Sequence, residues 1–309
     1  FSFWQQGGDR MNWRMSTVLL LWPMVASTIA ADELLSAGQF THEAARVLLV
    51  KEPHFEVTEV RPLEIQYQEP GKSGTPQHMY LDNAYKEYQA QPDQLKQILA
   101  AHVRGVEVAA SMPACTSGSV LPSLKNREFV EGTRQLVAKL HAENPNSPAA
   151  QKPAPFPITE PLVGDLFVTY VIDTPDATLA MTAEKLAQCG VEQAALPKLA
   201  ADNLRAKARD FSVVAIPQLP GISGVSGDRY YETALLVLDD YWDKTRFPFK
   251  GDIVVAVPAR GMLLVTDSAD QGAVDRLSGV AHKLYANQAY NLSPDLFIRR
   301  DGAWVMIRN

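Results

Sequence analysis

The strongest candidate for a chemical role in this chain is an arginine at the tip of an expected turn. Arg260 lies in Pro258-Ala259-Arg260-Gly261, between two runs of apolar residues. Binding residues are often carried on loops that a rigid scaffold positions, and a guanidinium can hold a carboxylate through two parallel hydrogen bonds. Arg260 is therefore a candidate ligand-binding residue. The alternative is an ordinary surface arginine, or one paired structurally with a nearby aspartate.

Four aspartates are candidate partners of Arg260 in a ligand site. Asp239 and Asp243 are four residues apart, so they share one face of the helix that we expect there. Two carboxylates on one face could bind a divalent cation, and the alternative is a solvated acidic face. Asp173 lies in a turn, where aspartate often bonds to nearby backbone, and Asp165 precedes an apolar run. Catalysis would require at least two of the four to reach one pocket with the arginine.

The sequence contains no pattern that specifies a metal, a cofactor or a nucleophile. The 6 histidines do not form the H-x-x-x-H or H-E-x-x-H spacings of zinc sites. The Gly-rich stretch 221–227 lacks the G-x-S-x-G frame of a nucleophile elbow and the Gly-Lys-Ser/Thr of a phosphate loop, so we interpret it as a flexible connection. We therefore expect no metal and no cofactor.

Composition narrows the class of protein. The chain of 309 residues is 46% hydrophobic and 21% charged, which is typical of a globular protein. Its net charge is −6, which gives no basic footprint for nucleic acid. We expect the partner to be an unidentified protein or small molecule. Our first hypothesis is a non-catalytic binding or adaptor protein. The alternatives are a hydrolase-like enzyme that uses the aspartates and Arg260, and a purely structural role in an envelope assembly.

Residues 1–31 differ in kind from the rest of the chain. Arg10 and Arg14 precede an apolar run over 18–26, and small residues follow before Asp32. This pattern is typical of a bacterial signal peptide, and the apolar run is shorter than the ~17–25 residues that span a bilayer. We expect cleavage after residue 30 or 31, export to the periplasm or the extracellular space, and no stable membrane span afterwards. An uncleaved anchor is the alternative.

Export would place the 2 cysteines, Cys115 and Cys189, in an oxidising compartment, where a pair can form a disulfide. Neither lies in a Cys-x-x-Cys motif, so a thioredoxin-like redox role has no support. Spacing alone does not decide whether the two Cβ atoms meet. The sequence therefore leaves two alternatives, a disulfide between Cys115 and Cys189 or two separate thiols.

The elements that must position these residues indicate an α+β fold: two mixed α/β units with largely antiparallel sheets, joined by a Pro-rich linker. After the leader and signal peptide (1–31), residues 32–108 form a small N-terminal α+β domain. In it, Thr41 is expected to cap the first helix and Gly105 to end the last. Residues 109–157 comprise a connecting loop over 110–126, an amphipathic helix over 127–143 and the linker.

The C-terminal α+β domain, 158–309, carries more strand signal. Its apolar run 166–172 is typical of a buried strand. Residues 253–257 and 262–266 predict a hairpin that carries Arg260, and Asp301-Gly302 predicts the turn of a second one. Residues 231–242 have the spacing of an amphipathic helix. Asn203 is expected to act as a structural peg for a loop.

Several of these segments, in this order, resemble the core of the YtpQ-like family, bacterial proteins of unknown function. They are 81–88 (Leu-x-Asn-x-Tyr-x-x-Tyr), 164–173, 199–204, 232–236 with 241–242, 251–260 and 292–297. The resemblance covers most of the chain after the leader and implies a shared fold but no activity. It also implies Arg-Asp where this chain has Arg260-Gly261. If that aspartate served catalysis, its absence argues against catalysis here; if it only oriented the arginine, binding could survive.

Overall fold

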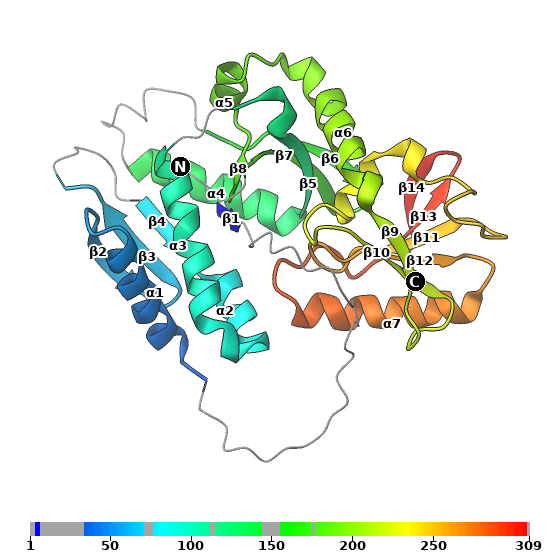
Figure 1. Ribbon diagram of the computed structural model, residues 1–309, viewed down its shortest axis with the longest axis horizontal. Coiled ribbons are helices and arrows are strands. Elements are labelled where there is room, and N and C mark those ends of the chain that lie inside the picture. The colour runs from blue at the N-terminus through cyan, green and yellow to red at the C-terminus, as the bar shows by residue number, and fades with distance from the viewer. Residues whose placement is uncertain are drawn as a thin grey trace. The chain divides into compact units, whose positions relative to one another are not determined.

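The computed structural model of the protein describes residues 4–6, 34–70, 77–111, 115–143, 155–174 and 177–307 (Figure 1). They form two compact units with helices and antiparallel sheets, which confirms the predicted α+β class. Apart from strand β1 (Trp4–Gln6), the predicted leader lies outside the described residues, as does 144–154 of the predicted linker. Within the described ranges, no helix has the length and apolar character needed to cross a membrane.

Unit 1 comprises Phe1–Pro113, Ala138–Ala154 and Thr174–Leu179. A three-stranded antiparallel sheet in the order β2-β3-β4 shares a core with three helices; Phe40, Leu48, Tyr67 and Leu99 are among the residues buried in it. Strand β1 pairs with β8. The elements are α1 (Ala37–Lys51), β2 (Glu56–Arg61), β3 (Glu64–Gln68), β4 (Gln77–Tyr80), α2 (Asp82–Ala90), the 3-10 helix η1 (Pro92–Gln94), α3 (Leu95–Ser111) and β8 (Ala177–Ala180).

Two predicted helix boundaries in unit 1 are wrong. Ser36 caps α1, since its hydroxyl accepts from the Gln39 amide while the Gln39 side chain accepts from the Ser36 amide. Thr41 lies inside the helix, where its hydroxyl donates to the Ala37 carbonyl. Helix α3 continues through Gly105 to Ser111, because one interior glycine costs only about 1 kcal/mol and apolar residues on both sides of it are buried.

Unit 2 comprises Ala114–Val137, Pro155–Asp173 and Ala180–Asn309. In its first sheet, β5 (Val120–Asn126) and β6 (Thr159–Val163) each pair antiparallel with β7 (Leu166–Asp173). Unit 2 also contains α5 (Ala183–Gln188), α6 (Leu196–Lys207) and the part of α4 (Arg127–Glu143) that runs to Val137. The segment that the sequence assigned to a connection thus supplies a sheet strand of unit 2.

The second sheet of unit 2 is antiparallel, in the order β14-β13-β11-β12-β10-β9, and helix α7 (Gln271–Asn287) packs its buried residues against one face (Figure 1). The predicted hairpins 253–266 and 296–307 are confirmed. The strands are β9 (Ser212–Ala215), β10 (Ile222–Ser226), β11 (Ile253–Ala256), β12 (Leu264–Asp267), β13 (Leu296–Arg300) and β14 (Ala303–Ile307).

Two loops predicted in unit 2 are strands instead. Residues 120–126 form β5, in which every residue is buried; Pro122 is tolerated because β5 lies at an edge of its sheet in the strand order. Residues 222–226 form β10. The glycine that follows it serves close packing rather than flexibility, since a Cβ at Gly227 would overlap the ring of Phe211.

The helix predicted over 231–242 is also wrong. The chain forms two short 3-10 helices there, η5 (Thr233–Val237) and η6 (Asp239–Tyr241), separated by an extended Leu238. Indole groups take two of the backbone acceptors: Trp242 Nε1 donates to the Leu235 carbonyl and Trp304 Nε1 to the Leu236 carbonyl. Apolar residues occur at helical spacing here because most of the segment is buried; the spacing does not reflect one buried helix face.

Candidate functional site

The end of strand β5 is tied to a distant loop of unit 2. Asn126, its last residue, donates from Nδ2 to the Asn291 carbonyl at 3.2 Å, and its Oδ1 accepts from the Phe129 amide at 2.9 Å. A buried amide side chain that satisfies both its oxygen and its nitrogen fixes the local backbone. Asn126 therefore ties the end of β5 to the loop that contains Asn291.

The turn that carries Arg260 runs along the same loop. The Arg260 amide donates to the Tyr290 carbonyl at 3.1 Å, and Ala259 forms an antiparallel bridge with Asn291. The Leu292 amide donates to the Pro258 carbonyl at 2.9 Å. These bonds join the turn that carries Arg260 to the loop that the end of β5 contacts, and Arg260 is the charged residue that acts on the Lys125 amine.

The Arg260 guanidinium is stacked on aromatic rings. Its Cζ atom lies 3.7 Å from the ring centroid of Tyr290 and 4.5 Å from that of Tyr230. Cation–π contacts of this kind are worth roughly 0.5–2 kcal/mol, depending on solvent exposure. They also fix the plane of the guanidinium, which presents its donors in a defined direction.

Gly261 allows the loop that bears Tyr230 to approach this turn. Gly261 has a φ of +70°, and a Cβ built on it would overlap the backbone carbonyl of Arg229. Arg229 and Tyr290, on either side of the arginine, also adopt the left-handed region, with φ of 67° and 54°. Such conformations cost about 1–3 kcal/mol each for residues other than glycine and cluster at functional sites.

Lys125 is a candidate residue that the sequence patterns did not indicate. Its side chain is 8% exposed, and its Nζ lies 4.5 Å from the ring centroid of Phe129. Burial lowers the Lys125 pKa well below its ordinary value, and the positive charge of Arg260 lowers it further. Within the described part of the chain, no ion pair joins Lys125 to a carboxylate. Arg260 therefore supplies the positive charge here, beside an amine whose charged form burial disfavours, and poorly solvated positive sites favour anions.

A buried glutamate holds the loop that presents Tyr230. Glu232 is 1% exposed, and its Oε1 accepts from the amides of Gly227 at 2.9 Å and Arg229 at 2.6 Å. Its Oε2 has no hydrogen-bond partner among the described residues. Burial raises the Glu232 pKa to about 7, although the two amides act in the opposite direction. Asp228 accepts from the Tyr230 amide at 3.0 Å and completes the loop's support.

The four predicted aspartates lie in separate settings. Asp165 pairs with Arg127 at 2.9 Å and is 63% exposed; Asp239 pairs with Arg299 at 2.8 Å and is 86% exposed. Asp173 lies 3.8 Å from Lys207 Nζ. Asp243 accepts from the amides of residues 245 and 246, which lower its pKa together with the neighbouring positive charge. The contacts of Asp165, Asp239 and Asp243 do not include Arg260.

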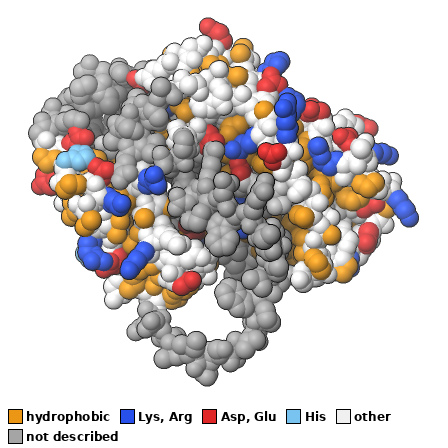
Figure 2. Space-filling view, in the orientation of Figure 1, with side chains coloured by type: hydrophobic (Ala, Val, Ile, Leu, Met, Phe, Trp, Pro, Cys, Tyr) orange, Lys and Arg blue, Asp and Glu red, His pale blue; other side chains and the backbone are white. Residues whose placement is uncertain are grey.

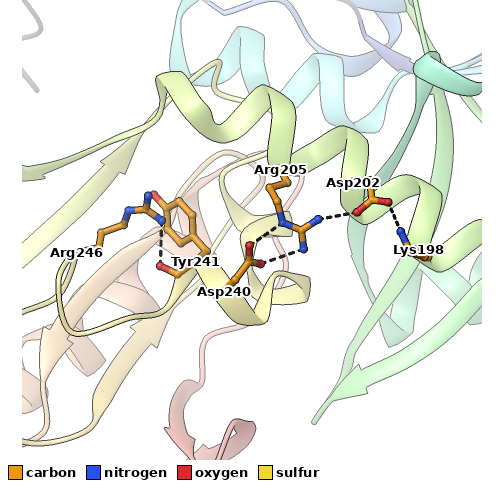
Figure 3. Close-up of polar contacts among 6 residues, drawn as sticks. All are labelled: Lys198, Asp202, Arg205, Asp240, Tyr241 and Arg246. Carbon is orange, nitrogen blue, oxygen red and sulfur yellow. Dashed lines mark hydrogen bonds and ion pairs between the residues drawn. The ribbon is translucent and has the colours of Figure 1, made fainter.

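Two other aspartates, Asp202 on α6 and Asp240 beside Asp239, form ion pairs with basic side chains (Figure 3). Arg205 donates to Asp240 at 2.7 Å and to Asp202 at 2.7 Å, and Asp202 also accepts from Lys198 at 2.6 Å. The hydrogen bond from Arg205 is the main reason that the Asp240 pKa is lowered. Acidic and basic side chains are interspersed on the visible surface (Figure 2). Because residues 239–243 do not form one α-helix, the predicted shared face does not exist. No group of three or more His, Cys, Asp or Glu in the described ranges could hold a metal ion.

Two further contacts fix the entry to β5. The sulfur atoms of Cys115 and Cys189 are joined in a disulfide, with Cα atoms 5.1 Å apart, which answers the question that the sequence left open. Asn203 on α6 donates to the carbonyls of Ser117 at 2.7 Å and Val120 at 2.8 Å, as expected of a structural peg. The strand that carries Lys125 is thus anchored at both ends.

Comparison of this chain with protein families, with curated proteins and with solved structures finds no match.

Proposed function

We propose that the protein is an exported, non-catalytic binding protein of the periplasm or cell envelope, and that Lys125 and Arg260 take the carboxylate of a small ligand. The observation that supports this is the juxtaposition of a buried lysine with an arginine stacked on two tyrosines. An amine buried without a carboxylate is costly to the fold. An external anion would offset that cost by favouring the charged form of the amine.

The arginine suits this role because little of its freedom remains to be lost on binding. Tyr230 and Tyr290 hold the guanidinium plane, and immobilising a side chain only at the moment of binding would cost about 0.5–1.5 kcal/mol. A planar guanidinium can bond both oxygens of a carboxylate at once. The fold therefore provides a preorganised recognition group, and the buried amine of Lys125 would gain a counter-charge from the bound anion.

The hydrolase-like alternative has less support. It requires at least two of the four predicted aspartates to work with Arg260, and three of them have other partners. The resemblance to the YtpQ-like family carries no activity. The glycine at position 261 is needed for the approach of the Arg229 loop, so the position favours binding by Arg260 over catalysis by an adjacent acid.

Thermal unfolding with a panel of small carboxylates tests the proposal. Acetate, succinate, pyruvate and lactate are compared with their neutral methyl esters, using the wild type, Arg260→Gln and the exposed control Arg134→Gln. At least one carboxylate is expected to raise Tm in the wild type and the control but not in Arg260→Gln. An equal rise in Arg260→Gln, or no rise with any anion, would refute it.

Proton uptake gives an independent check. A bound carboxylate raises the depressed Lys125 pKa, so above that pKa binding should take up protons. Calorimetric titrations in two buffers with different ionisation enthalpies measure this uptake directly. Binding with no proton uptake at any pH from 6 to 10 would mean that Lys125 does not contact the anion.

A further inference from the structure

One carboxylate closes the loop over 227–231. Glu232, which directly follows this loop, accepts through Oε1 from the amides of Gly227, at 2.9 Å, and Arg229, at 2.6 Å. The two hydrogen bonds tie the first and third residues of the loop to the residue that ends it. The loop therefore keeps this shape only while the Glu232 side chain stays in its buried position.

The closed loop lies against the turn that carries Arg260. The ring centroid of Tyr230 is 4.5 Å from the Arg260 Cζ atom, and a Cβ on Gly261 would overlap the Arg229 carbonyl. Arg229 has a φ of 67°, which is unfavourable for a residue other than glycine. Opening the loop would relieve this strain and remove Tyr230 from the guanidinium.

The Glu232 carboxylate is buried without a counter-charge. Its Oε2 atom has no hydrogen-bond partner among the described residues. The titratable groups that act on it are Asp228, in the same loop, and Tyr241, from η6. The nearby cation Lys207, on α6, pairs with Asp228 at 3.0 Å. A charge buried in this way is costly to the fold, so the closed loop favours the neutral acid.

We propose that residues 227–231 form a proton-gated flap on Arg260, which is closed while Glu232 is neutral and opens to hydrate the carboxylate when Glu232 ionises. Burial raises the Glu232 pKa to about 7, which places the change near neutral pH. Opening takes Tyr230 away, so an anion then meets a guanidinium that is no longer held by this ring. The inference rests on the proposed function for the role of Arg260, but the movement of the loop is measured without a ligand.

A second loop of unit 2 provides an internal control. Asp267 accepts from the amides of Lys250 at 2.8 Å, Gly251 at 2.9 Å and Ala269 at 2.9 Å. Burial acts to raise the Asp267 pKa, but the hydrogen bonds from these amides outweigh it and lower the pKa. Asp267 therefore stays ionised across the neutral range, and its loop should not respond to pH between 6 and 8.

Amide hydrogen exchange of the full chain at pH 6, 7 and 8 tests the flap. After correction for the intrinsic exchange rate, protection of the 227–231 amides should fall about tenfold from pH 6 to pH 8. Linkage requires this for a carboxyl whose pKa is 4.5 when hydrated and about 7 when buried. Protection should stay constant with pH in Glu232→Gln, and in the wild type at the three amides bound to Asp267.

Low urea separates a local opening from global unfolding. Urea concentrations below the unfolding transition should leave exchange of the 227–231 amides unchanged, since a local opening exposes little surface. The flap is refuted if these amides exchange only in step with urea-promoted unfolding, if their protection is equal at pH 6 and pH 8, or if it falls equally in the Asp267 loop. The Asp267 comparison decides the matter even if Glu232→Gln does not fold.

The outcomes separate the flap from the proposed function. A loop that does not respond to pH removes the flap and leaves carboxylate binding by Arg260 standing, because the thermal shifts with the carboxylate panel do not depend on the loop's response. A loop that opens as expected while the whole panel fails to raise Tm keeps the movement and removes the role of Arg260.

Discussion

The buried carboxylate of Glu232 predicts a specific dependence of stability on pH. Its pKa rises from the ordinary 4.5 to about 7 in the folded protein, chiefly through burial. The folded state therefore binds more protons than the unfolded chain between these two values. By linkage, the stability that the neutral form contributes is fully present below pH 4.5 and is lost as pH rises through about 7.

The size of the effect follows from the two pKa values. The gap between 4.5 and about 7, at about 1.4 kcal/mol for each pH unit, corresponds to roughly 3 kcal/mol. Glu232→Gln keeps the oxygen that accepts from Gly227 and Arg229 and removes the charge. We expect the variant to exceed the wild type in free energy of unfolding by less than about 1 kcal/mol at pH 5 and by roughly 3 kcal/mol at pH 8.5.

Urea unfolding at pH 5, 7 and 8.5 measures this difference. Trp242 and Trp304 report on the transition, since their rings lie in edge contact, with centroids 4.9 Å apart, near the segment that follows Glu232. Glu192→Gln, an exposed glutamate in the same unit, is the matched control and should leave the pH dependence unchanged. A gap between wild type and Glu232→Gln that stays constant with pH, or that widens towards low pH, would refute the reasoning.

Three further predictions concern the same unit. Lys125→Met should stabilise the protein by about 1 kcal/mol or more. Because burial depresses the lysine pKa below 10.5, the gain in stability should be greatest at low pH and disappear as pH rises through 10.5. Calorimetry from pH 6 to 11 can check this. Gly261→Ala should cost about 2–4 kcal/mol through its positive φ and backbone overlap, whereas Gly279→Ala, with open space around it, should be neutral or stabilising in chemical denaturation. Replacing Cys115 and Cys189 together by alanine should cost about 4 kcal/mol, as expected for a bridge spanning 74 residues, and reductant should then have no further effect on Tm.

Periodicity predicted the elements that have one buried face or one buried run. Strand β7 and helix α4 are examples, and both hairpins of the second sheet were evident from their turns. Periodicity failed as a predictor where tertiary contacts, rather than hydrogen bonds between residues close in sequence, determine the backbone conformation. Strand β5 contains a proline and a lysine and still lies buried, and the segment before Trp242 gives its carbonyls to indoles rather than to helical amides.

The candidate site was visible in the sequence only in part. Arg260 stands out because it occupies a turn, which is a local property. Its neighbours Lys125, Tyr230 and Tyr290 come from three other segments, and no spacing along the chain relates them. Lys125 was missed for the further reason that its strand was taken for a loop. The four aspartates attracted attention by residue type alone, and the structure gives them separate partners.

Several features that lower the stability of unit 2 lie on Arg260 and on the segments that contact its turn. Lys125 is a buried amine, Glu232 is a buried carboxylate, and Arg229 and Tyr290 adopt backbone conformations that disfavour their side chains. Departures from local rules that gather at one place are characteristic of functional sites rather than of packing. If the site only stabilised the fold, replacing Lys125 or Glu232 by a neutral side chain would weaken it. The opposite result, a more stable protein that has lost its ligand, is what a binding site predicts.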